Sequence, residues 1–206
     1  MNKEILLWFC LGFTSLLQVQ AQDKWELKKN ENGIEVYARQ LANSKLKEIR
    51  VICELDATLA ELVSVLQDVS NHKTWVYSTR NSYLVKKINA NTLIYYTESD
   101  LPWPVSDRDL IVELQVNPQP ENQQYIIRAK GISDYLPPKP NLVRVPYSLA
   151  LWKITPVPEN KIKIDYTFSV DPGGSIPAWL INSTAAIGPY NSFIKLREIL
   201  KSRRSK

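Results

Sequence analysis

Alternation of apolar and polar residues is the sequence feature that most constrains the fold of this chain. One such stretch begins at position 161, and its apolar side is formed by Ile162, Ile164, Tyr166, Phe168 and Val170. A strand with one apolar and one polar side is typical of an antiparallel sheet that covers a core with one face. The same pattern predicts strands over 34–39, 45–55, 82–88, 92–99, 109–116, 123–131, 143–155 and 161–170.

Turn and helix signals interrupt the strands. The pair Asn32-Gly33 predicts a turn before the first strand, and Asn89-Ala90-Asn91 predicts a hairpin turn between two later strands. At Thr58 the apolar spacing changes to three and four residues, and Thr58 with Glu61 has the pattern of a capping box. A helix is therefore expected to begin there.

The last part of the chain predicts a long helix after a turn at 171–174. Gly188-Pro189 is expected to kink or break this helix, because proline clashes with the preceding turn. No internal repeat and no linker rich in proline, glycine or serine divides the 206 residues. The expected fold is a single α+β domain, in which a long curved antiparallel sheet wraps around a long C-terminal α-helix.

The first 21 residues have the pattern of a secretory signal. Lys3 precedes an apolar run, and small or short residues at Val19-Gln20-Ala21 suit a signal peptidase. The run is shorter than the ~20 residues that cross a bilayer, which disfavours a retained anchor helix. We expect an exported protein, periplasmic or extracellular, with residues 1–21 removed and one domain over 22–206. Cys53 is then its remaining cysteine, interpreted as an inert thiol on the core side of a strand.

The residue inventory argues against most catalytic and metal-binding classes. The single histidine, His72, stands in a polar stretch that we interpret as surface, and two cysteines do not make a zinc site. No nucleotide-binding, hydrolase or metalloprotease motif is present, so no cofactor and no metal are expected. The Asp107-Arg108-Asp109 triplet at a strand start is typical of turn and edge positions rather than of acid–base catalysis. The net charge of +5 and the basic segment 195–206 favour anionic partners only weakly, and no nucleic-acid binding is expected.

One passage of the chain is distinctive. Residues 101–112 read Leu-Pro-Trp-Pro-Val-Ser-Asp-Arg-Asp-Leu-Ile-Val, and residues 171–182 lead from an Asp-Pro-Gly-Gly turn into the last helix. Together with Trp75 and Trp152, these motifs resemble the START family, the steroidogenic-acute-regulatory-related lipid-transfer domains of the helix-grip superfamily. The resemblance covers residues 25–200. It implies a helix-grip fold with an internal apolar cavity that holds one lipid or sterol, although a signal segment is unusual among the family's familiar intracellular members.

The resemblance and the alternation together suggest a set of ligand-binding residues: Arg108, Glu98, Trp75, Tyr96, Val112, Leu114, Ile164, Tyr166, Trp179 and Ile187. Arg108 shares the parity of Val112, so it is expected to face the core and to need a carboxylate or a ligand oxygen as its partner. Glu98 is the expected carboxylate, because the hairpin between the two strands brings positions 98 and 108 together. The alternative is an outward Arg108 that pairs with Asp107 or Asp109 in solvent.

Three classes of function are compatible with these residues. The leading hypothesis is a monomeric, non-enzymatic binder or carrier of a lipid, a sterol or another hydrophobic small molecule, with residues 101–105 and Gly188-Pro189 as candidate hinges. The second is a cyclase- or aromatase-like enzyme that uses the same cavity, with Arg108, Glu98, Asp107 or a tyrosine in proton transfer. The third is an interaction module whose basic C-terminal segment contacts a protein or an anionic membrane surface.

The signal interpretation makes a direct prediction. Protein recovered after export should begin at Gln22, because a signal peptidase cleaves after the short residues that end at Ala21. N-terminal sequencing of the exported protein checks this. A chain that keeps Met1 and stays in the membrane fraction would contradict it.

Overall fold

The fold is taken from a computed structural model that describes residues 24–41, 47–119, 124–176 and 178–204, without the side chains of 178–185. The expected signal segment 1–21 lies outside these residues. The elements in chain order are β1 (Glu26–Glu31), β2 (Ile34–Gln40), β3 (Lys47–Leu55), α1 (Leu59–Gln67), the 3-10 helix η1 (Val69–Thr74), β4 (Thr79–Lys87), β5 (Thr92–Ser99), β6 (Arg108–Gln119), β7 (Gln124–Gly131), β8 (Val143–Arg144), β9 (Tyr147–Val157), β10 (Lys161–Asp171) and α2 (Ala178–Arg204).

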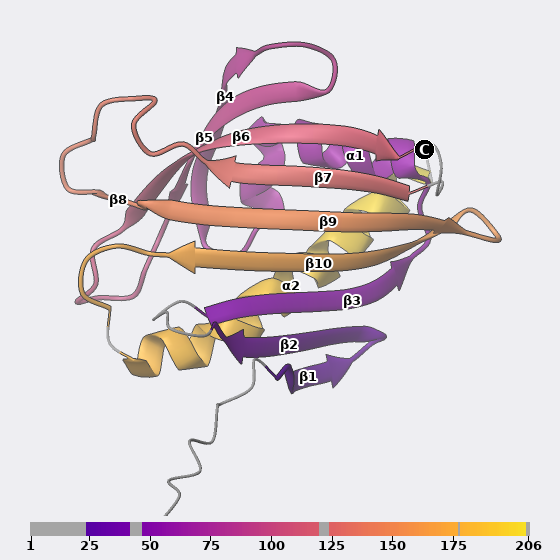
Figure 1. The fold of residues 1–206 in the computed structure, drawn as a ribbon, viewed down its shortest axis with the longest axis horizontal. Helices are drawn as coiled ribbons and strands as arrows, with labels where there is room; N and C mark the ends of the chain where they lie inside the picture. Colours follow the sequence, from indigo (N-terminus) through magenta and orange to yellow (C-terminus); the bar gives the residue numbers. More distant parts are fainter. Residues whose placement is uncertain (1–23, 42–46, 120–123, 177, 205–206) are drawn as a thin grey trace, which may run out of the picture.

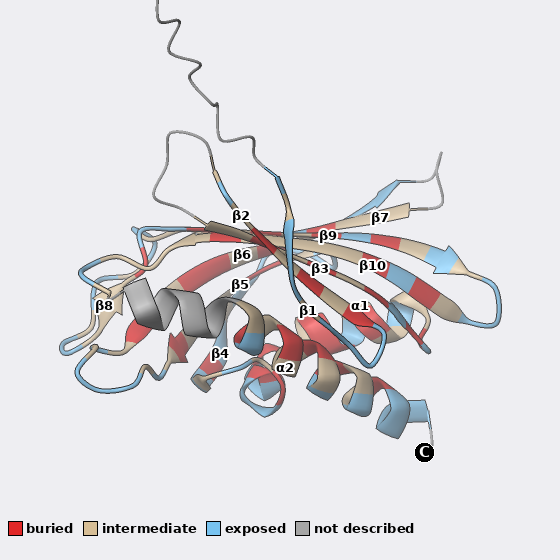
Figure 2. Cartoon of the chain, turned by 90° about the horizontal axis from the view of Figure 1, so that it is seen from below, coloured by how far each residue is buried: buried red, intermediate tan, exposed pale blue. Residues whose placement is uncertain are grey.

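The ten strands of the described part form one sheet, nine of them in the order β1-β2-β3-β10-β9-β7-β6-β5-β4. Neighbours in this order are antiparallel, and the short β8 pairs with β6 in parallel. Figure 1 shows α2 crossing behind the sheet, and Figure 2 shows the sheet curved over α2, with α1 on the same side. The expected α+β helix-grip architecture is confirmed.

The predicted turn and cap signals have the expected local structure. Asn32 and Gly33 have positive φ angles of 53° and 69°, a backbone that asparagine and glycine adopt most readily, and they join β1 to β2. At the start of α1, the Thr58 N–H donates to Glu61 Oε2 at 2.5 Å, and the Glu61 N–H donates to Thr58 Oγ1 at 3.3 Å. The capping box predicted from sequence is thus present.

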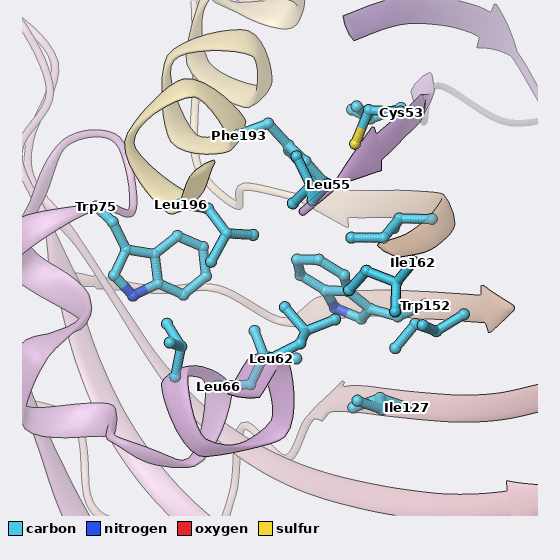
Figure 3. Close-up of a cluster of buried hydrophobic side chains, with 14 of the residues drawn as sticks. Cys53, Leu55, Leu62, Leu66, Trp75, Ile127, Trp152, Ile162, Phe193 and Leu196 are labelled. Carbon is cyan, nitrogen blue, oxygen red and sulfur yellow. The ribbon is translucent and has the colours of Figure 1, made fainter. Parts of the chain in front are cut away.

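The core lies between the C-terminal half of α2, the sheet and α1. Buried α2 side chains recur at helical spacing and face the sheet: Tyr190, Phe193, Leu196 and Leu200. The Phe193 ring lies 5.3 Å from that of Trp152 and 5.4 Å from that of Tyr166, centroid to centroid. Figure 3 shows Leu62 and Leu66 of α1 reaching into the same cluster. This contact fixes α2 to the sheet at one end.

The basic end of α2 is engaged within the chain. Arg203 Nη2 donates to Asp68 Oδ2 at 2.8 Å, and Arg204 Nε donates to Glu61 Oε1 at 3.0 Å. The hydrogen bond from Arg204, with the one from the Thr58 N–H, lowers the pKa of Glu61 to about 2. A basic segment such as 195–206 usually forms a solvated face. Two of its arginines instead tie the end of α2 to α1.

Three predicted features differ in the structure. The strand expected over 143–155 is divided into β8 and β9, which fits the missing N–H of Pro146 between them. β1 was not predicted, since its residues are mostly exposed on both sides. The expected break at Pro189 is absent, because α2 continues through it. Proline removes one backbone hydrogen bond, and burial of the following turn against the sheet holds the helix.

Candidate functional site

The inner face of the sheet, which α2 covers, changes in character along its length. Large aliphatic residues fill the core end, but the inward positions of β7 and β9 near the start of α2 are small: Ala129, Gly131, Ser148 and Ala150. A Cβ built on Gly131 would lie 2.7 Å from Ser148 Oγ, so glycine permits the close approach of these strands. At these positions the sheet therefore presents no large side chain toward the first turns of α2.

Four predicted lining residues lie on this inner face. Val112 and Leu114 of β6 and Ile164 of β10 are buried, and Tyr166 of β10 is half-buried against the core. Burial raises the pKa of Tyr166. Leu114 and Ile164 belong to the main apolar cluster, whereas Val112 belongs to neither apolar cluster of the described residues. Val112 is therefore the one of the four that lies outside the packed apolar core.

Trp75 sits beside His72 where η1 meets the sheet. Trp75 is 5% exposed, and the His72 ring lies 5.3 Å from the Trp75 ring and 5.1 Å from that of Tyr95. His72 is itself 6% exposed, so our interpretation of a surface histidine was wrong. The apolar face of η1 carries it inward. Burial lowers the pKa of His72 to about 4. Its Nε2 lies 3.0 Å from the Leu66 carbonyl oxygen, an acceptor, so the neutral ring carries its hydrogen there.

Arg108 is buried but does not pair with Glu98. Its Nε and Nη2 donate to the carbonyl oxygens of Pro172 and Gly173 at 3.4 and 3.1 Å, and Nη1 donates to the Ser106 carbonyl. Burial lowers the pKa of Arg108. Backbone oxygens at the entrance to α2 thus take the place of the expected carboxylate.

The predicted Glu98–Arg108 pair fails because of strand register. The β5–β6 ladder aligns Ser99 with Arg108 and Glu98 with Asp109. Glu98 and Tyr96 therefore share a face with Asp109, on the side of the sheet away from α2. Tyr96 packs there in a separate apolar cluster. The expectation that Tyr96 and Glu98 contact a ligand on the inner face is corrected accordingly.

The outer face carries a buried polar network instead. The Tyr96 hydroxyl lies 3.0 Å from Glu98 Oε1 and 3.1 Å from Asp109 Oδ2. Arg144 Nε and Nη2 each donate to Asp109 at 2.9 Å, and Lys139 Nζ lies 3.0 Å from Glu98 Oε1. Burial alone would raise the pKa of Glu98, but hydrogen bonds from Lys139, Tyr96 and Arg80 lower it. The network holds the segment after β7 against the sheet.

Two predicted residues lie on α2. Ile187 is 49% exposed, which contradicts its placement in a cavity wall. The neighbouring Gly188 faces the Tyr77 ring, where a Cβ would lie 3.2 Å from Cδ1, and Tyr190 is buried. Ile187 is thereby turned outward. The side chain of Trp179 lies outside the described residues.

The loop between β5 and β6 presents one aromatic side chain to solvent. Trp103 is 91% exposed. The loop around it is ordered by the Leu101 N–H, which donates to Asp107 Oδ1 at 3.0 Å, and by the Val105 N–H, which donates to the Pro102 carbonyl at 3.1 Å. An exposed tryptophan on a fixed loop is a ready contact for an apolar surface.

The described residues offer few other candidate sites. They contain no group of three or more histidine, cysteine, aspartate and glutamate residues placed to hold a metal, and no helix long and apolar enough to cross a bilayer. Burial raises the pKa of the Cys53 thiol to about 12, in line with an inert cysteine. A groove of about 460 Å³ opens on the outer face, lined by Ile94, Glu113, Lys130, Gly131, Ile132, Ser133, Asp134 and Tyr135.

Comparisons with known proteins agree with this fold. A START domain model matches residues 13–206. The crystal structure of the STAR-related lipid transfer protein of Xanthomonas axonopodis (fragment 25-204) has a TM-score of 0.79 and 31% identity, and the match covers 86% of this chain and 98% of that one. The chain belongs to the START domain family.

Curated relatives extend from bacteria to mammals. An uncharacterized protein of Pseudomonas aeruginosa is 29% identical over 181 residues, which cover 88% of this chain and 89% of that protein. The mouse phosphatidylcholine transfer protein is 28% identical over 175 residues, which cover 83% of this chain and 80% of that protein. The similarity therefore spans most of each of these proteins.

The placement of side chains on the two faces of the sheet predicts which pairs of substitutions are coupled in double-mutant cycles. Arg108→Met and Glu98→Gln should change the free energy of unfolding additively, within about 0.5 kcal/mol, because their side chains lie on opposite faces. Asp109→Asn and Arg144→Met should instead be coupled by about 1–3 kcal/mol, because each leaves a buried partner unpaired. Denaturant unfolding of the single and double variants measures both. Strong coupling between Arg108 and Glu98 would contradict the register.

Proposed function

We propose that this protein binds one lipid, or another hydrophobic molecule of similar size, between the inner face of the sheet and α2. The observation that carries the proposal is the inner face itself. Its side chains are apolar or uncharged, they become small toward the start of α2, and Arg108 is held by backbone carbonyls at its edge. An apolar lining with a few polar groups is typical of small-molecule sites in proteins.

Relatives support the same ligand class. The chain is similar over most of its length to proteins named for phosphatidylcholine transfer and for STAR-related lipid transfer. No chemical step is part of the proposal. The carboxylates that the enzyme hypothesis needed do not suit it, since Glu98 lies on the outer face and Asp107 pairs with Arg80 at 2.7 Å. We therefore favour a carrier over an enzyme.

Exchange of the ligand with a membrane is the second part of the proposal. Tryptophan prefers the interface between water and hydrocarbon, and Trp103 stands free on an ordered loop next to β6. We infer that this loop contacts a membrane when a lipid enters or leaves. We propose that this activity lies outside the cytoplasm, in the periplasm or beyond, because residues 1–21 have the pattern of a secretory signal.

Lipid uptake tests the binding part of the proposal. The mature protein should take up a fluorescent phosphatidylcholine, fatty acyl or sterol probe, and Val112→Trp should abolish this uptake, because the added ring fills space at the inner face. Gln115→Trp adds a comparable volume to the outer face of the same strand and is the control. Circular dichroism verifies that both variants fold. Equal uptake by wild type and Val112→Trp would place the ligand elsewhere.

Transfer between vesicles tests the role of Trp103. Trp103→Ala should slow movement of a bound fluorescent lipid from donor to acceptor vesicles several-fold, because the loop loses its apolar contact, while affinity for the probe stays unchanged. Tyr135→Ala removes an exposed aromatic from the outer face and should leave the rate as in wild type. A Trp103→Ala protein that transfers at the wild-type rate would refute membrane contact through this loop.

A further inference from the structure

Two buried polar atoms in the described residues have no hydrogen-bond partner: Trp75 Nε1 and Ser82 Oγ. Both residues are only 5% exposed. A buried donor that is left unpaired loses its hydrogen bonds to water without compensation, and such groups are therefore rare in folded proteins. Two of them in adjoining elements call for a partner from outside the chain.

Strand register places Ser82 on the inner face. Ser82 pairs with Thr97, which shares a face of β5 with Tyr95, and Tyr95 packs against the main core. The next residue, Tyr83, stacks on Tyr96 at 4.9 Å and faces outward. Ser82 therefore points to the side of the sheet where the lipid is proposed to bind.

Trp75 reaches the same part of the inner face from η1. The 3-10 helix packs against β4, and the His72 ring at its centre contacts both Trp75 and Tyr95. In Figure 3 the indole nitrogen of Trp75 is turned away from Leu196 on α2. The N–H therefore points away from that core contact.

The surroundings of these two atoms favour an uncharged partner. The Trp75 ring contacts the neutral His72, which in turn contacts Tyr95, and the register partner of Ser82 is Thr97, so the neighbours that these contacts identify are uncharged. A phosphate in such surroundings would be a buried charge without compensation. Indole N–H is a donor only, and a serine hydroxyl can donate, so the partner that satisfies both is an acceptor oxygen.

We propose that Trp75 Nε1 and Ser82 Oγ bind a carbonyl oxygen of the lipid, either the ester carbonyl of a glycerolipid or the amide carbonyl of a sphingolipid. This inference rests on the proposed lipid-binding function. It assigns the two residues a role in ligand choice: lipids with a carbonyl near the head group bind better than ether analogues that lack one.

Three lipids with the same phosphocholine head group test the inference: fluorescent diacyl phosphatidylcholine, its dialkyl ether analogue and sphingomyelin. Ser82→Ala and Trp75→Phe should each weaken binding of a carbonyl-bearing lipid about five- to tenfold, the loss expected for one hydrogen bond. Binding of the ether analogue should not change. If the variants lose affinity for the diacyl lipid alone, the bound group is the ester carbonyl. If they lose affinity for sphingomyelin alone, the bound group is the amide carbonyl.

Ser82→Ala also separates a ligand contact from a structural role. The hydroxyl has no partner in the chain, so the denaturant midpoint of the lipid-free variant should equal or exceed that of wild type. Ser169→Ala removes a buried hydroxyl from the outer face and is the matched control for binding. Unchanged affinity of Ser82→Ala and Trp75→Phe, or equal losses with the ether analogue, overturns the inference alone. Failure of wild type to bind any of the three lipids or a sterol probe overturns the proposed function as well.

Discussion

The packing of the C-terminal half of α2 on the curved sheet is the contact on which the rest of the molecule depends. Phe193 stacks against Trp152, and Leu196 and Leu200 are almost fully buried in the same cluster. Arg203 and Arg204 add hydrogen bonds to α1 at this end. With one end of the helix held in this way, the region near its start need not be filled by large side chains. The small inward residues of β7 and β9 occur in that region.

The two faces of the β5–β6 hairpin have different roles. The outer face stabilises the fold, and the inner face is the one proposed to contact the ligand. Its outer face buries Asp109 against Arg144, and Tyr96 bridges Asp109 and Glu98. Charges that are paired in this way are costly to break singly, which makes the network suited to holding a segment in place. Apart from Arg108 at its edge, the inner face of the same hairpin carries Val112 and other apolar or uncharged side chains. A charge network on that side would disfavour a hydrocarbon ligand.

The sequence could predict the architecture because the alternation of apolar residues reports directly on which side of a strand is buried. Thr58, Glu61 and the Asn32-Gly33 pair specify local geometry that depends on few other residues, so their predictions are confirmed. Partners across strands depend on register, which alternation alone does not give. The observed register differs by one residue from the expected pairing of 98 with 108, so Glu98 lies opposite Asp109 on the outer face. The burial of His72 was missed because its neighbours in sequence are polar.

The candidate site was predictable in part. Val112, Leu114, Ile164 and Tyr166 follow from strand parity, while Ser82 was overlooked because one serine in a largely exposed edge strand carries no signal in sequence. Ser82 stands out only in the structure, where its hydroxyl is buried without a hydrogen-bond partner.

Native mass spectrometry of the protein exported by its own host, followed by lipid extraction, tests the binding function most directly. One lipid or other hydrophobic molecule should be retained per chain, and it should be recovered chemically unchanged. A protein that carries no ligand, and that takes up none when it is offered lipid vesicles, would contradict the assignment. Recovery of a chemically altered molecule after incubation would point instead to an enzyme.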